Sequence, residues 1–432
     1  MKNQKEILSK LNIDALNPMQ ESALDAISSS NNTILLSPTG TGKTLAFLLP
    51  VLDLLDHNNP EVQVLILVPS RELAIQIEQV IRNMGTGFKV NAIYGGRAMS
   101  KDKIELKHTP AILVGTPGRI LDHFMADRFT KEHINTLILD EFDKSLEVGF
   151  EEEMTEILAE LPNLKKRILT SATEAVKIPK FVGMENPRRI NYLKKNTPSK
   201  LTISTVISEE DKLKTLVQLL KYIGEEPGII FCNLKDSIDT VSSFLSQKHI
   251  LHECFSGGME QKDRERALIK FRNGSSRILV ATDLAGRGMD IPELKFIIHY
   301  ELPQRVEEFT HRNGRTARVN EAGTAYVVKW DKEKLPGFAS NSKPINIGKT
   351  NRLGDPFWET LFISGGRKDK ISKGDIAGLF FKQGGLKREQ LGDIELKQDC
   401  AFVAVPKNKS KELVDSLNNS RLKKKKVRIT VL

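Results

Sequence analysis

The chain has 432 residues, a length that favours about three domains over a single hydrophobic core. Its hydrophobic (39%) and charged (28%) contents are ordinary for a soluble globular protein, no apolar run approaches the roughly 20 residues of a membrane span, and the N-terminus lacks the apolar stretch of a signal peptide. The net charge of +10 favours a polyanionic partner, and three widely spaced cysteines without a CxxC pair argue against a zinc site or a disulfide framework, so we expect a cytoplasmic protein in a reducing compartment.

Short apolar runs alternate with longer amphipathic segments in the first part of the chain. The segment 71–85, for example, has helical spacing and ends in glycine. Continuously apolar runs are expected of parallel strands that are covered on both faces, and five of them lie at residues 33–37, 64–69, 111–117, 136–141 and 166–173. The alternation predicts a doubly wound α/β domain over residues 1–197, with functional loops at the carboxyl ends of the strands.

The stretch "TILLSPTGTGKTLAFLLP" predicts a strand, a glycine-rich turn and the start of a helix. Gly40 and Gly42 allow backbone amides to curl around phosphate oxygens, and the helix N-terminus faces the anion. Lys43 reaches the terminal phosphates, while the Thr44 hydroxyl is suited to bind Mg²⁺. The predicted phosphate loop consists of Ser37, Pro38, Thr39, Gly40, Thr41, Gly42, Lys43 and Thr44, with Ser37 at a position that is usually glycine.

The stretch "LILDEFDKSLEVGF" places two acids, Asp140 and Glu141, directly after an apolar run. Buried carboxylates are costly unless a cation compensates them. A phosphate loop needs an acid on a neighbouring strand to hold Mg²⁺ through its water shell, so we assign Asp140 to the metal together with Thr44. Glu141 is suited to orient or deprotonate the attacking water. A helix N-cap after a strand explains one acid but not two.

The α/β pattern pauses at polar residues around Pro198 and then restarts. Apolar runs at 228–233, 277–283, 296–303 and 324–330 predict a second α/β domain over residues 198–333. Residues 334–358 are rich in Pro, Gly, Ser and Asn and are predicted to be a linker. The last segment, 359–432, has a mixed β/α pattern and contains 17 Lys and Arg against 9 Asp and Glu, a balance of +8. Most of the net charge therefore lies there, which indicates a nucleic-acid contact.

Together these blocks resemble the DEAD-box family of ATP-dependent RNA helicases, from about residue 12 to residue 323. The resemblance rests on the ordered blocks "NPMQ", "SPTGTGKT", "PSRELAIQ", "YGGR", "VGTPGRI", "DEFD" and "TSAT", followed by "GGMEQKDRERAL", "ATDLAGRGMDIP" and "HRNGRTAR". It implies two tandem RecA-like lobes with doubly wound parallel sheets, ATP and Mg²⁺ as cofactors, and closure of both lobes on ATP and RNA.

The resemblance also implies roles for single residues in ATP hydrolysis. Gln20 matches the glutamine that reads adenine, and Asp290 matches the ribose-binding acid, although a turn acid before Ile-Pro is an alternative for Asp290. Arg315 and Arg318 match the arginine fingers that stabilise charge on the γ-phosphate. With these two arginines, the expected catalytic residues are Lys43, Asp140, Glu141, Arg315 and Arg318.

Two further sets of residues follow from the same resemblance. The RNA-binding set is Arg71, Gly96, Thr116 and Arg119 in the first lobe and Gly258, Arg264 and Thr282 in the second. Contacts to phosphates carry no sequence information, so we expect the lobes to bind RNA with little sequence preference. The set expected to couple the two lobes is Asp143, Ser171, Thr173 and His311. Helix capping is the alternative for the two hydroxyls.

The chain departs from the family pattern at four places. The family usually has Ala at the position of Phe142, which we interpret as a packing variation that needs smaller neighbours behind the strand. No aromatic residue precedes Phe47, so stacking on adenine from that side is expected to be weaker or missing. Asn313 and Ala317 replace residues that are commonly Ile or Thr and Gly.

The last segment resembles the RNA-binding domain of DbpA-type DEAD-box proteins, an α+β domain that resembles the RNA-recognition motif (RRM). Phe362 and Phe402 lie where such a sheet stacks bases, with core packing as the alternative, and Cys400 stands where another aromatic is common. Phosphate affinity is expected from Lys368, Lys370, Lys373 and Lys423–Lys426. By analogy with DbpA-type members, residues 359–432 are expected to bind structured ribosomal RNA of the large subunit.

Three functions compete. The leading one is an RNA-stimulated ATPase that unwinds short structured RNA during large-subunit assembly. A cold-response or RNA-decay helicase with broader targets would use the same core. A non-catalytic RNA clamp or chaperone would require a damaged ATPase site, but Lys43, Asp140, Glu141, Arg315 and Arg318 are all present. A DNA helicase is disfavoured by Gln20 together with Asp143.

Overall fold

The computed structural model describes residues 4–174, 178–193, 201–283, 291, 294–317, 322–348, 350 and 352–432. The chain divides near residue 200 into two compact units, and each is described by itself. The predicted boundary between residues 197 and 198 lies outside the described residues. Within the described ranges, no helix has both the length and the apolar character needed to cross a bilayer.

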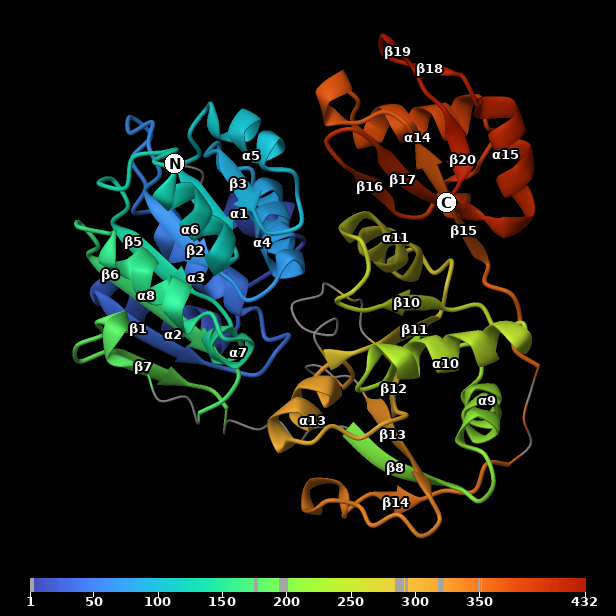
Figure 1. Cartoon of the computed structure of the whole chain (residues 1–432). Helices are drawn as coiled ribbons and strands as arrows, with labels where there is room; N and C mark the ends of the chain where they lie inside the picture. Colours follow the sequence, from blue (N-terminus) through green and yellow to red (C-terminus); the bar gives the residue numbers. More distant parts are fainter. Residues whose placement is uncertain are drawn as a thin grey trace. The chain divides into compact units, whose positions relative to one another are not determined.

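The first unit is built on a seven-stranded parallel sheet of order β3-β4-β2-β5-β6-β1-β7 (Figure 1). All five predicted strands are present. The strands are β1 (Asn32–Leu36), β2 (Val64–Leu67), β3 (Val90–Ile93), β4 (Ile112–Gly115), β5 (Thr136–Leu139), β6 (Lys166–Ser171) and β7 (Arg188–Asn191). The central strands β2 and β5 are buried at every residue, which explains why they are apolar without alternation.

Helices cover both faces of this sheet. Alternate strand residues enter two separate cores: Leu35 and Ile66 join one core, and Leu36 and Leu65 join the other. The first core is completed by α1 (Gln4–Lys10), α2 (Pro18–Ser29), α3 (Lys43–Leu52) and α4 (Arg71–Met84). The second is completed by α5 (Met99–Leu106), α6 (Pro117–Met125), α7 (Phe142–Val148), α8 (Glu151–Ala159) and the short 3-10 helix η1 (Lys180–Val182). The predicted doubly wound fold is confirmed.

The second unit begins with another seven-stranded parallel sheet, of order β10-β11-β9-β12-β13-β8-β14. Its strands are β8 (Leu201–Ser208), β9 (Gly228–Phe231), β10 (Glu253–Phe255), β11 (Ile278–Ala281), β12 (Phe296–His299), β13 (Gly323–Trp330) and β14 (Lys343–Pro344). Its helices include α9 (Lys212–Ile223), α10 (Lys235–Gln247), α11 (Gln261–Arg272) and α13 (Val306–Asn313), with η2 at Gly337–Ala339.

One segment differs from its prediction. The stretch 334–358, predicted as a linker, contributes β14, which pairs in parallel with β8 at the edge of the second sheet. Pro344 has no backbone N–H to donate, so an edge strand is the position that tolerates it. The strand was therefore not predicted, because the proline-rich composition of the segment is typical of a linker.

The C-terminal domain is a four-stranded antiparallel sheet of order β16-β17-β15-β20, and the predicted α+β domain is confirmed. Its strands are β15 (Trp358–Ile363), β16 (Ile394–Leu396), β17 (Ala401–Pro406) and β20 (Ile429–Val431), with a hairpin of β18 (Arg421–Leu422) and β19 (Lys425–Lys426). Helices α14 (Lys373–Lys382) and α15 (Ser410–Leu417) pack on the face that buries Leu361 and Ile363; the 3-10 helices are η3 (Arg367–Asp369), η4 (Arg388–Gln390) and η5 (Lys407–Lys409).

The opposite face of this sheet contacts the β9–β13 part of the same unit. Thr360 Oγ1 lies 2.6 Å from Ser275 Oγ and 3.2 Å from Asn273 Nδ2, both in the turn between α11 and β11. Arg272 forms an ion pair with Glu395 on β16. Part of the sheet face on which bases were predicted to stack is thus covered by protein.

Candidate functional site

The strand order of the first sheet brings the predicted nucleotide residues together. Because β5, β6 and β1 are neighbours and parallel, the segments that follow them leave the same edge of the sheet. The phosphate loop follows β1, Asp140 follows β5, and Ser171 ends β6. The Ser37 amide donates to the Ser171 carbonyl at 3.1 Å, which joins two of these segments directly.

The phosphate loop has the backbone that its glycines predict. Gly40 and Gly42 have φ of +81° and +85°, a left-handed conformation that side chains disfavour. Lys43 begins α3, and its Nζ donates to the carbonyls of Ser37 (2.7 Å) and Pro38 (2.9 Å). Burial lowers the pKa of Lys43, while Glu141 and Asp140 act in the opposite direction.

The predicted adenine reader lies against the phosphate loop. Asn17 and Gln20 form a capping box at the start of α2. From there, Gln20 Nε2 donates to the Gly42 carbonyl (3.3 Å) and Asn17 Nδ2 donates to the Thr41 carbonyl (3.0 Å). A nucleotide-dependent change in the loop would therefore be transmitted to α2 through these two hydrogen bonds.

Asp140 and Glu141 are buried side by side. Burial, and then the charge of Glu141, raises the pKa of Asp140 to about 6, although its Oδ1 accepts hydrogen bonds from Thr170 and from the Glu141 amide. Glu141 has φ of +49°, and its Oε2 lies 3.3 Å from Lys144 Nζ. A non-glycine residue held in the left-handed region is a common feature of functional sites.

The donor atoms fit Mg²⁺. Oxygen ligands and a destabilised buried carboxylate are what a hard divalent cation prefers. No cluster of three or more His, Cys, Asp or Glu suited to a metal occurs among the described residues. Thr44 and Asp140 remain the residues predicted to hold a magnesium ion, which usually takes its other oxygens from phosphate and water.

Phe142 is fully buried at the start of α7, in the second core of the first unit. Its phenyl ring has no polar atom, so its burial in this core fits the packing interpretation. The predicted compensation by smaller neighbours stays a prediction.

The predicted coupling residues of the first unit are bonded to one another. Asp143 Oδ2 accepts from Thr173 Oγ1 (3.1 Å) and from the Ala172 amide (3.3 Å), and Ser171 Oγ accepts from the Thr173 amide (3.0 Å). In the second unit, His311 is buried on α13. Thr173 thus contacts Asp143 directly, and Ser171 contacts Thr173.

The predicted RNA-binding residues of the first unit lie along the other half of the sheet edge. Arg71 begins α4 after β2, Gly96 follows β3, and Thr116 is the N-cap of α6 after β4. The Arg71 guanidinium occupies the space over Gly96, whose φ of +79° suits glycine. Arg119, on α6, has a side chain that is only 10% exposed. The four residues converge, but Arg119 faces inward.

The remaining predicted residues belong to the second unit. Gly258 is exposed after β10 and Thr282 follows β11, and these two strands are neighbours. Arg264 is buried, with its guanidinium 5.1 Å from the centre of the Phe255 ring, and Arg315 is buried in the turn after α13. Asp290 and Arg318 lie outside the described residues.

The sequence does not predict a role for Arg312. It is 2% exposed, forms two hydrogen bonds with the Asp283 carboxylate, and donates to the Glu301 carbonyl (2.6 Å) and to Asn233 Oδ1 (2.7 Å). It therefore fixes α13, which precedes Arg315. The block "HRNGRTAR" predicts roles for the other arginines, and Asp283, the partner of Arg312, lies 29 residues away in the chain, so no local sequence pattern indicates the pair.

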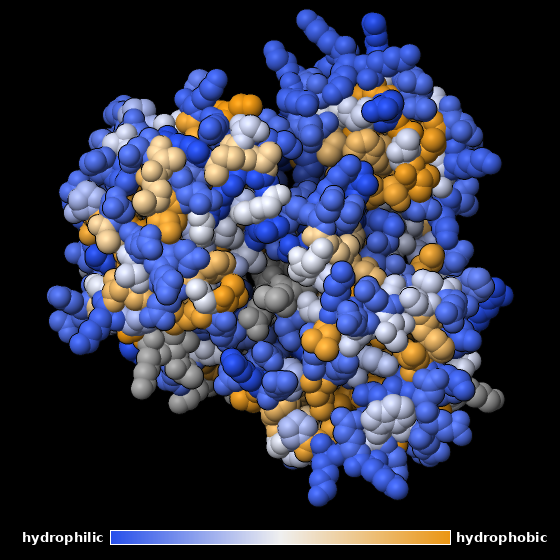
Figure 2. Space-filling model, in the orientation of Figure 1, coloured by the Kyte–Doolittle hydropathy of each residue, from blue (hydrophilic) through white to orange (hydrophobic). Residues whose placement is uncertain are grey.

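Of the lysines predicted to bind phosphate, Lys423–Lys426 lie in the β18–β19 hairpin, whereas Lys368, Lys370 and Lys373 lie at η3 and at the start of α14. Lys423 and Lys425 pair with Asp375 and Asp369, each at 2.8 Å, while Lys424 and Lys426 are exposed. Hydrophilic side chains project from this end of the domain in Figure 2. Phe362 and Phe402 form an edge-to-face pair with centroids 5.7 Å apart, and Phe402 is only 5% exposed. The hairpin is thus the more accessible surface.

Three family models match the chain in order. Residues 17–180 match the DEAD/DEAH box helicase model, residues 211–320 match the helicase conserved C-terminal domain, and residues 360–431 match the DbpA RNA binding domain.

Curated relatives match over nearly the whole length. The ATP-dependent RNA helicase DbpA of Bacillus subtilis is 30% identical over 95% of this chain and 93% of its own. The protein of the same name from Escherichia coli is 30% identical over 98% of this chain and 96% of its own. Among solved structures, S. cerevisiae Dbp5 bound to RNA and ADP BeF3 aligns over 76% of this chain and 88% of its own, with a TM-score of 0.68 and 26% identity. Mss116p bound to ssRNA and AMP-PNP aligns over 76% and 73%, with a TM-score of 0.69 and 27% identity.

Proposed function

The chain belongs to the DEAD-box family of ATP-dependent RNA helicases, and from this premise we propose that it remodels structured ribosomal RNA during assembly of the large ribosomal subunit, in the cytoplasm. The observation that carries the RNA target is the C-terminal domain: residues 360–431 match the DbpA RNA binding domain and hold most of the net charge. We propose residues 359–432 as the targeting module and residues 1–197 and 198–333 as the two lobes. Residues 334–358 would connect the lobes to the module, and their strand β14 belongs to the sheet of the second lobe.

The buried acids supply the proposed chemistry of ATP hydrolysis in the "DEFD" variant. Lys43 neutralises charge on the terminal phosphates, and Glu141 orients or deprotonates the attacking water. Mg²⁺, held by Thr44 and Asp140, would supply further neutralisation of phosphate charge. Gln20 and Asp290 recognise the nucleoside, and Arg315 and Arg318 act as arginine fingers.

ATP hydrolysis is coupled to RNA binding through polar residues that are hydrogen-bonded to one another. Asp143, Ser171 and Thr173 are joined within the first unit by hydrogen bonds of 3.0 to 3.1 Å, and we propose that His311 is their counterpart in the second. The RNA backbone would be held by Arg71, Gly96 and Thr116, with the inward-facing Arg119 of the same set behind them, and by Gly258, Arg264 and Thr282.

The catalytic role of Glu141 is tested by Glu141→Gln. We expect ATP and RNA binding to persist and RNA-stimulated turnover to fall by about 10² or more, because a general base typically contributes ~10²–10⁴. Steady-state ATPase assays with and without RNA give the turnover, and Glu152→Gln, an exposed acid on α8, is the matched control. Normal turnover in Glu141→Gln contradicts its assigned role. Absence of RNA stimulation in the unaltered protein favours the non-catalytic clamp.

The RNA target is tested by crosslinking the full chain to cellular RNA and sequencing the RNA attached to residues 359–432. Enrichment of one large-subunit ribosomal RNA region supports the proposal. Crosslinks spread over many messenger RNAs favour the broader cold-response or decay helicase instead.

A further inference from the structure

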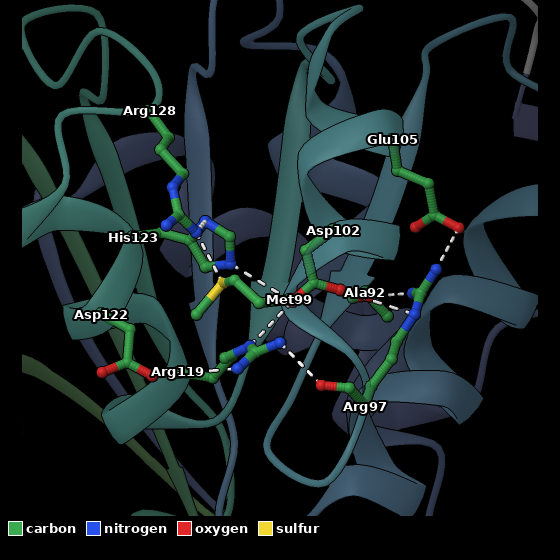
Figure 3. A network of polar contacts seen from close by, with 9 residues as sticks. All are labelled: Ala92, Arg97, Met99, Asp102, Glu105, Arg119, Asp122, His123 and Arg128. Carbon is green, nitrogen blue, oxygen red and sulfur yellow. Dashed lines mark hydrogen bonds and ion pairs between the residues drawn. The ribbon is translucent and has the colours of Figure 1, made fainter.

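A buried carboxylate lies outside the nucleotide site, among the RNA-facing loops of the first unit. Asp102, on α5, is fully buried, and three cationic or potentially cationic side chains surround it (Figure 3). Its Oδ2 accepts from Arg119 Nε (2.7 Å) and lies 3.2 Å from His123 Nε2, and its Oδ1 lies 3.5 Å from Arg97 Nε. Burying an ionised carboxylate is costly unless cationic groups pair with it.

Arg119 uses its fork of donors to join two segments. While Nε donates to Asp102, Nη2 donates to the carbonyl oxygen of Arg97 at 2.8 Å (Figure 3). The first bond runs from α6 to α5, and the second runs from α6 to the loop between β3 and α5. A planar guanidinium makes both bonds in one fixed geometry, which a lysine does not reproduce.

Arg97 holds the other side of the loop. Its guanidinium pairs with Glu105 at the end of α5 and contacts the Ala92 carbonyl on β3 at 3.4 Å. Its side chain is 18% exposed, so this arginine is mostly committed to the protein. The loop is therefore tied at one residue both to its preceding strand and to its following helix.

His123 and Arg128 complete the enclosure. His123 is fully buried on α6, and its Nδ1 lies 3.2 Å from Arg128 Nη1. Burial favours a raised pKa for Asp102, but the hydrogen bonds from His123 and Arg119 outweigh it and the pKa is lowered. Asp102 thus stays ionised at neutral pH.

The segments joined by this network carry the proposed RNA-facing residues. Gly96 directly precedes Arg97, Thr116 lies less than one turn before Arg119, and the Thr116 amide donates to the Ile93 carbonyl at 3.3 Å. Arg71 lies over Gly96. We propose that Asp102 is a positioning residue for RNA binding, whose carboxylate locks the β3–α5 loop to the start of α6 so that Arg71, Gly96 and Thr116 form a preorganised surface for the phosphate backbone. The proposal rests on the RNA-binding role assigned above to these loops.

The first test is Asp102→Asn, which keeps the size of the side chain and removes its charge. We expect the RNA concentration for half-maximal ATPase to rise about 10-fold, because a preorganised surface is lost, while kcat at saturating RNA and KM for ATP change less than about 2-fold. Asp122→Asn is the matched control, since Asp122 is 57% exposed on α6 and lies 3.9 Å from Arg119. An equal fall in kcat with unchanged RNA dependence would overturn the proposal.

A double-mutant cycle separates positioning from general stability. If Asp102 acts through Arg119, the Asp102→Asn/Arg119→Gln variant has the same RNA dependence as Arg119→Gln alone, whereas independent effects multiply. Should Asp102→Asn fail to fold, Arg119→Lys replaces it, since lysine keeps the charge but does not bridge the two segments, and the same rise in half-saturating RNA is expected.

Hydrogen exchange gives a readout that needs no RNA. In Asp102→Asn, or in Arg119→Lys, the amides of residues 94–99 are expected to exchange at least about 10-fold faster, with β1 and α3 unchanged. Unchanged exchange in this loop refutes the locking role even if RNA stimulates the ATPase. Faster exchange in a protein that RNA does not stimulate supports the lock and instead refutes the proposed function.

Discussion

Two non-glycine residues with positive φ lie at or near the predicted catalytic residues. Glu141 (φ +49°) ends the apolar run of β5, and Ala317 (φ +50°) follows Arg315 by two residues. The left-handed region costs a non-glycine residue about 1–2 kcal/mol. The resemblance implies that glycine is common at residue 317, and Ala317 has a backbone conformation that suits glycine although it carries a methyl group. At Glu141 the strained backbone belongs to a residue whose carboxylate is held in place by neighbouring side chains.

Phe142 gives a prediction at this scale. Phe142→Ala is expected to lower the free energy of unfolding of the first unit by about 3–5 kcal/mol, because a fully buried phenyl group leaves a cavity. The kcat of the folded protein should change little, since the acids on either side carry the chemistry. Urea unfolding followed by circular dichroism gives the first quantity.

The chain supplies an internal control for that measurement. Its two tryptophans, Trp330 and Trp358, both belong to the second unit, so their fluorescence transition should stay unchanged in Phe142→Ala. Loss of ATP hydrolysis without loss of stability would contradict the packing interpretation.

At the scale of elements, β12 and α13 are joined by buried polar contacts. His299 at the end of β12 is fully buried, its Nε2 lies 3.0 Å from Asn313 Oδ1 on α13, and its ring stacks on Phe309 with centroids 4.6 Å apart. Asn313 is one of the departures from the family pattern, and its partner His299 gives the physical reason for an amide there. Together with Arg312, this contact orients the turn that carries Arg315.

This pair predicts a pH dependence of stability. Burial lowers the pKa of His299 to about 3, whereas an unfolded histidine has a pKa near 6.5. Between these values the unfolded state binds more protons, so the contribution of His299 is complete above pH ~6.5 and is lost by up to ~1.4 kcal/mol per pH unit as the pH falls toward 3. Unfolding of the second unit, followed by tryptophan fluorescence, should therefore lose about 2 kcal/mol more between pH 7.5 and 5 in the unaltered protein than in His299→Asn. Equal losses in the two proteins would show that His299 does not titrate as inferred.

At the scale of the whole molecule, the net charge is concentrated in the domain proposed to bind the RNA target and not in the parts proposed to hydrolyse ATP. The two parallel-sheet parts carry nearly balanced charge, and the C-terminal domain carries a balance of +8 out of +10. Part of its sheet face contacts Asn273 and Ser275, so electrostatic binding is left to edges such as the β18–β19 hairpin. Such binding depends on salt because counterions are released from the nucleic acid.

The hairpin can be tested by Lys424→Ala/Lys426→Ala. Removing two exposed charges should weaken RNA binding and lower the slope of log affinity against log salt by about 1.5, at ~0.7–0.9 per phosphate contact. Affinities measured between 50 and 200 mM salt, chosen as the range where such slopes are usually read, give the slope. Lys382→Ala/Lys387→Ala removes two exposed lysines of the same domain and is the matched control. Equal changes in both variants would mean that only net charge matters.

The sequence by itself determined most of the strands that are buried on both faces, the phosphate loop, and the acids after β5, because each depends on a local pattern of residue types. The buried strand β3 was not predicted, because its short run contains the polar Asn91. Strands such as β7 and β8 are partly exposed, so their patterns were too weak to predict. The tertiary structure alone decided which segments meet: strand order placed the phosphate loop, Asp140 and Ser171 at one half of a sheet edge and Arg71, Gly96 and Thr116 at the other. Asp102, Arg312 and His299 were invisible in the sequence for the same reason, since the burial and pairing that define them come from residues far apart in the chain.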